Sequence, residues 1–239
     1  MADRAALVTG GSSGIGLAIA RALAEDGYGV TLSARTPDKL ETTAKELTDD
    51  GLDINAVPAN MSKEEEIGSL ASAHRDRYGR LDVLVNNAGI GIGGQIADAE
   101  TKKLDLQLDV NLRGVYLMSR EAIPALREAG CETGKALILN LSSIAGKYGQ
   151  PWLAAYSATK AAVVGLSQAM QGELSDDGVQ VTAFCPGFVA TAMTDWVENV
   201  PKEEMIQPED IAEAVRFLLK TSPACIVPEI QFVRPNDRM

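Results

Sequence analysis

Residues 5–16 read Ala-Ala-Leu-Val-Thr-Gly-Gly-Ser-Ser-Gly-Ile-Gly, and they carry the clearest fold signal in the sequence. Its first five residues are a short apolar run typical of a buried strand. The glycines at 10, 14 and 16 leave no side chain where the backbone must turn sharply, and a helical pattern follows over residues 15–25. The free N–H groups and positive dipole at the start of such a helix favour an anion such as a pyrophosphate. A plain tight loop is the alternative, and the position between first strand and first helix argues against it.

The same alternation of strand, turn and helix continues along the chain. We expect strands at residues 5–9, 28–34, 54–58, 81–85, 136–141, 179–185 and 226–233. We expect helices at residues 15–25, 37–50, 99–128, 153–174 and 208–220, and a further one that Ser62 caps. Such alternation is typical of the α/β class, here a Rossmann-type doubly wound parallel sheet of about seven strands flanked by helices. No linker divides the chain, so we expect one dinucleotide-binding and catalytic domain over residues 1–239, with a substrate lid at about 188–207.

Composition argues against several other classes of protein. The formal net charge of -11 suits neither the phosphates of nucleic acid nor an anionic membrane. No apolar run is long enough to span a bilayer and no secretory signal is visible, so we expect a cytoplasmic protein. The cysteines, at 131, 185 and 225, lack the spacing of a disulfide framework or a zinc site, and we expect no metal. The single histidine, His74, lies in a charged stretch that we interpret as an exposed helix end, which argues against a Ser-His-Asp triad.

The end of the second predicted strand indicates which dinucleotide is bound. This strand end approaches the adenosine ribose in folds of this kind, and a carboxylate there would repel a 2′-phosphate. The sequence instead reads Ser33-Ala34-Arg35-Thr36. Arg35 offers a planar, permanently charged fork to a phosphate, with Ser33 and Thr36 as further hydroxyl donors. The sequence therefore favours NADP(H) over NAD(H); the alternative is that Arg35 is a solvated surface residue.

A tyrosine and a lysine four residues apart form the candidate acid/base pair. Tyr156 and Lys160 share one face of the expected helix at 153–174. A neighbouring ammonium stabilises a phenolate, so we expect the pKa of Tyr156 to be lowered towards neutrality. Ser143 ends the fifth expected strand, where open α/β sheets place their ligands, and its hydroxyl could donate to a substrate oxygen.

A second glycine-rich run, Gly89-Ile90-Gly91-Ile92-Gly93-Gly94, also fits the dinucleotide spacing. It follows Asn86-Asn87-Ala88 and comes three strands into the sheet, so we interpret it as a loop over the cofactor or the substrate.

With these motifs together, the chain resembles the short-chain dehydrogenase/reductase family over nearly its whole length. The resemblance implies that Asn111 organises a proton relay, Ser143 holds the carbonyl oxygen, Tyr156 donates the proton and Lys160 binds the nicotinamide ribose. It also implies a homodimer or homotetramer. The remaining positions that it assigns to cofactor binding are Gly10, Ser12, Ser13, Gly14, Ile15, Gly16, Arg35, Asn60, Met61, Asn87, Ala88, Gly89, Pro186, Gly187, Val189 and Thr191.

Two positions depart from the family pattern. Asn60 stands where many relatives have an aspartate that contacts adenine, although its amide oxygen could still accept from the adenine amino group. The C-terminal strand lacks the usual Gly-Gly ending and contains Pro228, which cannot donate a ladder hydrogen bond, so the usual contact through that strand would be altered.

The substrate is left open by the sequence. Apolar residues of the expected lid, with walls at 91–96 and 149–153, suit an apolar ketone, aldehyde or 3-oxoacyl group, or they pack on the core or a partner subunit. The lid residues are Met193, Trp196, Val197, Val200, Met205 and Ile206. The expected activity is reduction of a carbonyl, or oxidation of the matching secondary alcohol. The rival functions are a cofactor-binding sensor or regulatory protein on the same fold, and an epimerase or dehydratase.

Overall fold

The computed structural model describes residues 3–235, so both ends of the expected domain, residues 1–2 and 236–239, lie outside the described residues. Seven parallel strands form one sheet in the order β3-β2-β1-β4-β5-β6-β7. The strands are β1 (Ala5–Thr9), β2 (Gly29–Ala34), β3 (Ile54–Pro58), β4 (Val83–Asn86), β5 (Ala136–Leu141), β6 (Val179–Pro186) and β7 (Glu229–Phe232). This sheet confirms the expected doubly wound fold, and its strands begin and end within a few residues of the predicted ones.

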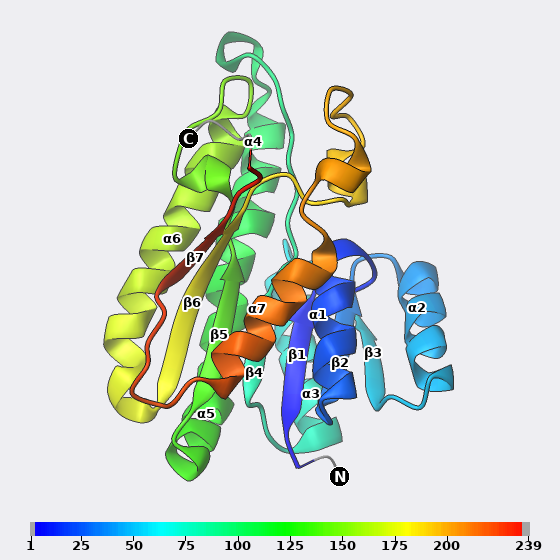
Figure 1. The fold of residues 1–239 in the computed structure, drawn as a ribbon, viewed down its shortest axis with the longest axis vertical. Coiled ribbons are helices and arrows are strands. Elements are labelled where there is room, and N and C mark those ends of the chain that lie inside the picture. Colours follow the sequence, from blue (N-terminus) through cyan, green and yellow to red (C-terminus); the bar gives the residue numbers. More distant parts are fainter. Residues whose placement is uncertain (1–2, 236–239) are drawn as a thin grey trace.

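Helices cover both faces of the sheet (Figure 1). The helices are α1 (Gly14–Glu25), α2 (Pro37–Asp49), α3 (Glu64–Tyr78), α4 (Thr101–Leu108), α5 (Gly114–Thr133), α6 (Ala154–Leu174) and α7 (Pro208–Lys220). One hydrophobic cluster joins the sheet to α1, α2 and α7, and a second joins its other face to α3, α5 and α6. Every residue of β1, β2, β4, β5 and β6 is buried, as expected for parallel strands covered on both sides.

Two helix boundaries differ from the prediction. The helix expected to be capped by Ser62 begins one residue later, with Lys63 at its N-cap, because the Ser62 hydroxyl donates instead to Oδ1 of Asn60 at 2.9 Å. The helix expected over 99–128 is divided into α4 and α5 by a π-helical turn, Asp109–Arg113 (η2). One extra residue in a helical turn re-aims the side chains around it, and such turns often occur at functional sites.

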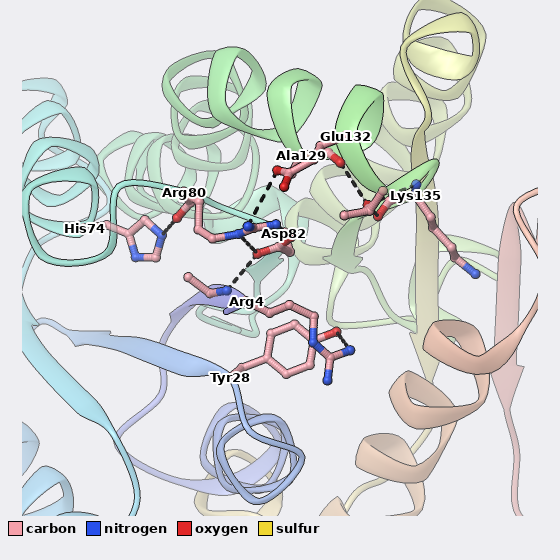
Figure 2. Close-up of polar contacts among 10 residues, drawn as sticks. Arg4, Tyr28, His74, Arg80, Asp82, Ala129, Glu132 and Lys135 are labelled. Carbon is pink, nitrogen blue, oxygen red and sulfur yellow. Dashed lines mark hydrogen bonds and ion pairs between the residues drawn. The ribbon is translucent and has the colours of Figure 1, made fainter. Parts of the chain in front are cut away.

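The interpretation of His74 as an exposed residue is wrong. His74 is 3% exposed, and its ring lies at the amino ends of the strands, beside a polar cluster that joins β1 to the segment before β4 (Figure 2). The Arg80 carbonyl can only accept, so Nε2 of His74 donates to it at 2.9 Å and Nδ1 accepts from the Thr31 hydroxyl at 2.7 Å. Burial lowers the pKa of His74 to about 4, so the ring is neutral at pH 7. The charged neighbours of His74 in the sequence indicate an exposed segment, but the packing of α3 on the sheet turns this side chain towards the interior.

Next to His74, a buried carboxylate holds the start of the central strands together. Asp82 accepts from the backbone N–H of Ala5 at 2.7 Å and pairs with Arg80 at 2.7 Å (Figure 2). A cavity of about 120 Å³ lies between α3 and α5 in this region. Because this end of the sheet is opposite to the carboxyl ends of the strands, the cavity is separate from the site described below.

Candidate active site

The strand order reverses beside β1, because the chain winds from β1 to β3 on one side and continues from β4 on the other. In open parallel sheets, ligands bind at the carboxyl ends of the strands at such a reversal. The turns after β1 and β4 meet there. Asn87 donates through Nδ2 to the carbonyls of Thr9 and Gly10, at 3.0 and 2.9 Å. The N–H groups of Asn87 and Ala88 in turn donate to the Thr9 hydroxyl.

These contacts explain why the turn after β1 has glycine at positions 10 and 16. Gly10 has φ +64°, and a Cβ there would lie 2.8 Å from Nδ2 of Asn87 and 2.9 Å from Cα of Ala88. At Gly16 a Cβ would lie 2.5 Å from the Gly10 carbonyl oxygen. Glycine is therefore required at positions 10 and 16 by the packing of the turn against the chain itself.

The start of α1 fits an anionic ligand. Ser13 is the N-cap residue, yet its side chain makes no capping hydrogen bond, and no acidic residue lies in the first turn. The first N–H groups of a helix have no partner within the helix and carry its positive dipole end. Ser13 is exposed, while Ser12, Gly14 and Ile15 are half-buried. The residues present therefore fit the pyrophosphate of a dinucleotide.

The ends of β2 and β3 carry the residues expected at the adenosine. Arg35 and Thr36 are exposed after β2, whereas Ser33 is buried and its hydroxyl has no partner among the described residues. Oδ1 of Asn60 accepts from the N–H and the hydroxyl of Ser62, at 3.1 and 2.9 Å. The amide oxygen expected to accept from adenine is thus held in a local turn. Met61 beside it is buried.

Ser143, Tyr156 and Lys160 come together at the carboxyl ends of the central strands. Ser143 is 9% exposed; its hydroxyl donates to the Pro186 carbonyl at 3.4 Å and lies near enough to the Tyr156 phenol to lower the pKa of that phenol. Lys160 is 4% exposed, its Nζ donates to the Leu141 carbonyl at 2.7 Å, and Nζ lies 5.7 Å from the centre of the Tyr156 ring. The sequence predicted this grouping, and here it follows from β5 ending next to the first turns of α6.

The expected effect of Lys160 on Tyr156 is corrected by the structure. Burial raises the pKa of Tyr156 above its ordinary value, and only the hydrogen bond from Ser143 opposes this. Burial also lowers the pKa of Lys160 to about 8. Removal from water disfavours a phenolate and an ammonium alike, and here it outweighs the attraction that the i, i+4 spacing suggested.

Asn111 lies in the π-helical turn and is fully buried. Its Oδ1 accepts from the N–H of Ile90 at 2.8 Å, while its Nδ2 donates to the Ile90 carbonyl at 2.8 Å and to the Thr159 hydroxyl at 3.1 Å. A Cβ on Gly89 would lie 3.3 Å from Nζ of Lys160 and 3.4 Å from Oδ1 of Asn111. Asn111 therefore fixes the loop after β4 against α6, with Thr159 as a partner that the sequence gave no reason to select.

The segment after β6 closes the site from the other side. The N–H of Gly187 donates to the Phe232 carbonyl at 2.8 Å, and Val189 is buried and pairs with Ile206. A Cβ on Gly14 would lie 2.9 Å from Cγ2 of Thr191, so this segment contacts the start of α1. Residues 186–191 thus lie between the anion-binding turn and the residues around Tyr156.

One residue near Tyr156 was missed as an individual candidate. Trp152 belongs to the expected wall at 149–153, and its backbone has φ +69°, the one positive φ of a non-glycine residue in the described chain. Sequence carries no signal for a bulky residue in that conformation, because it depends on contacts made after folding.

Over residues 3–235, no cluster of three or more His, Cys, Asp or Glu side chains is placed to hold a metal ion. Within the same residues, no helix has the length and apolar character needed to cross a membrane.

Comparison with known proteins agrees with this geometry. The family model described as short chain dehydrogenase matches residues 4–201. An uncharacterised oxidoreductase of Staphylococcus aureus is 37% identical over 235 residues, 98% of either chain. A 3-oxoacyl-[acyl-carrier-protein] reductase of the same species is 37% identical over 225 residues, 90% of either chain.

Solved structures give the same result. An alcohol dehydrogenase from Thermococcus sibiricus, complexed with 5-hydroxy-NADP, superposes with a TM-score of 0.89 at 33% identity, covering 99% of this chain and 98% of the other. A 3-ketoacyl-(acyl-carrier-protein) reductase from Brucella melitensis, complexed with NADH, gives a TM-score of 0.87 at 32% identity over 96% of each chain. The sheet order, the glycine turn and these similarities lead to one conclusion: the chain is an oxidoreductase of the short-chain dehydrogenase family, whose fold binds a nicotinamide cofactor.

Proposed function

We propose that this protein is an NADP(H)-dependent reductase of carbonyl compounds, or a dehydrogenase of the matching secondary alcohols, with Tyr156 as the acid/base. The observation that carries the proposal is the grouping of the Ser143 hydroxyl, the Tyr156 phenol and the buried Lys160 side chain at the carboxyl ends of the central strands. Burial keeps the phenol protonated, which is the form needed to give a proton to a carbonyl oxygen.

Each residue of the site has a distinct role in the proposed reaction. When bound, NADPH supplies a hydride to the carbonyl carbon. The Ser143 and Tyr156 hydroxyls lie at the same end of the sheet, where their O–H groups would donate to a carbonyl oxygen that gains negative charge. Tyr156 gives its proton to that oxygen, and the products are the alcohol and the oxidised cofactor. Lys160 lies beneath the phenol and has a pKa of about 8, so it can return a proton near neutral pH.

The remaining predicted residues have positioning or binding roles in this proposal. Asn111 fixes the loop after β4 beside Lys160, where the family resemblance expects a relay. The first turn of α1 would hold the pyrophosphate, residues 87–89 and 186–191 would bind near the nicotinamide, and Arg35 would pair with the 2′-phosphate. Arg35 is exposed at the end of β2 and no carboxylate follows it before Asp38, which supports NADP(H) over NAD(H). Because Oδ1 of Asn60 already accepts from Ser62, this amide oxygen would be less available to the adenine amino group.

The proposal treats the chain as one dinucleotide-binding and catalytic domain in which residues 188–207 cover a small, apolar substrate. We further propose a homodimer or homotetramer, because four large apolar side chains of α4 and α5 are 38–56% exposed. They are Leu104, Leu106, Leu108 and Tyr116. A cytoplasmic location belongs to the proposal as well, since all three cysteines are free.

The test replaces Tyr156 by phenylalanine, which keeps the ring and removes the proton. We expect Tyr156→Phe to bind NADPH as the parent does and to lose turnover of carbonyl substrates by about 10²-fold or more. Nicotinamide fluorescence measures binding and NADPH absorbance measures turnover. Retention of turnover within a few-fold of the parent would remove Tyr156 from the mechanism, and binding of neither NADPH nor NADH would remove the enzyme proposal itself.

A further inference from the structure

The two tryptophans of the chain lie together. Trp152 is in the turn before α6, four residues ahead of Tyr156, and Trp196 lies within residues 188–207. Their ring centres are 5.9 Å apart with the planes inclined at 50°. The two residues are 51% and 55% exposed, so each indole has a face available to a ligand. A contiguous exposed patch of large aromatic side chains typically marks a binding surface, whereas single exposed apolar residues do not.

A short glycine-rich segment connects this pair to Tyr156. A Cβ on Gly93 would lie 2.0 Å from Cζ3 of Trp152, so the indole lies directly against that backbone. A Cβ on Gly91 would lie 3.6 Å from Cδ2 of Tyr156. Gly91 and Gly93 are at most about 7 Å apart along the chain, so the Trp152 indole and the Tyr156 ring pack along the same short loop. The glycines leave room for both rings.

The backbone of Trp152 is held in a costly conformation to place its ring there. Its φ of +69° lies in the left-handed region, which bulky residues avoid. The Gly94 N–H donates to the Trp152 carbonyl at 2.8 Å and fixes this conformation. On the other side, Phe188 packs edge-on against Trp196 with ring centres 6.2 Å apart. Retained backbone strain is found where a fixed side-chain position matters for function.

We propose that Trp152 and Trp196 form an aromatic gate that binds the flat ring of the substrate, so that the preferred substrates are aryl ketones and the matching aryl carbinols. This inference rests on the proposed reductase function and specifies its substrate class. Indole faces gain from stacked or edge-on contact with another aromatic ring, and a puckered aliphatic ring of equal size gains only by burial. A ring bonded to the carbonyl carbon would meet the gate while its oxygen meets Ser143 and Tyr156.

The first test compares phenyl methyl ketone with cyclohexyl methyl ketone, which differ in ring planarity and little in size. Trp152→Gly removes the indole, and glycine adopts φ +69° without strain, so this variant is expected to fold. We expect the ratio of kcat/KM, phenyl over cyclohexyl, to fall about tenfold in Trp152→Gly and in Trp196→Leu, mostly through KM. Phe217→Leu, which removes a similarly exposed aromatic ring on α7, should leave the ratio unchanged. An unchanged ratio in both tryptophan variants overturns the gate.

A second readout separates the gate from the reductase activity. Because both tryptophans belong to the gate, all tryptophan fluorescence of the chain reports on it. We expect phenyl methyl ketone, added with oxidised cofactor, to quench this fluorescence more strongly than cyclohexyl methyl ketone does. Selective quenching without NADPH consumption on any carbonyl would sink the reductase proposal and keep the gate. NADPH consumption with equal quenching by the two ketones would sink the gate and keep the reductase.

Discussion

The buried His74 makes the stability of this protein depend on pH in a calculable way. Its pKa is about 4 in the folded chain and about 6.5 for an ordinary histidine, so the unfolded chain binds more protons at pH values between these two. The contribution of His74 to stability is therefore complete above about pH 6.5 and is lost as the pH falls towards about 4. From about pH 7.5 to about pH 5, the linkage relation gives a loss of about 2 kcal/mol.

The assay is urea unfolding of the parent and of His74→Gln at several pH values down to about 5, just above the isoelectric point of about 4.6. Glutamine can still donate to the Arg80 carbonyl but has no titratable group, so the carboxylates, common to both proteins, cancel in the difference. We expect the stability of the parent relative to the variant to fall by about 2 kcal/mol over this range. A difference that does not change with pH would show that His74 is not buried as a neutral ring.

Three further outcomes are expected. Arg35→Asp should raise the ratio of the NADPH to the NADH dissociation constant at least about tenfold, because a carboxylate at this position repels a 2′-phosphate. Fluorescence titration with both cofactors measures this ratio, and an unchanged ratio would remove Arg35 from cofactor selection. Gly10→Ala should lower the free energy of unfolding by about 2 kcal/mol or more, since the added methyl group meets Asn87 and φ is +64°. Gly27→Ala, with φ +87° and no atom within 4 Å, should lower it by only about 1 kcal/mol, through backbone strain alone. Equal losses of the two variants in denaturant unfolding would contradict the packing argument. The rate of carbonyl reduction should fall as the pH rises through about 8, where Lys160 loses its proton. Lys160→Arg should lower the rate and remove this decrease from the pH–rate profile, because arginine stays protonated. A decrease that persists in the variant would show that another group titrates there.

Local chemistry was enough to predict most of the elements. β1, β3 and β5 begin and end at the predicted residues, because each is a mainly apolar run of five or six residues. The same holds for α7, which begins at Pro208. The π-helical turn at Asp109–Arg113 was not predictable, because it depends on Asn111 reaching across to Ile90 and Thr159, which are distant in sequence.

For the site, residue type and short-range spacing were enough to predict the family, the grouping of Ser143, Tyr156 and Lys160, and the glycine turn. Tertiary structure alone decided the protonation of these groups. Burial sets the pKa of Tyr156 against the direction that the neighbouring lysine suggested, and it makes His74 a neutral core residue. It also decided which exposed aromatic side chains lie together, because Trp152 and Trp196, 44 residues apart in sequence, meet only when the loops after β4, β5 and β6 pack on one another. The spacing of residues in the sequence indicates which chemical groups lie near one another locally, whereas solvent exposure and long-range contacts are set only when the chain has folded.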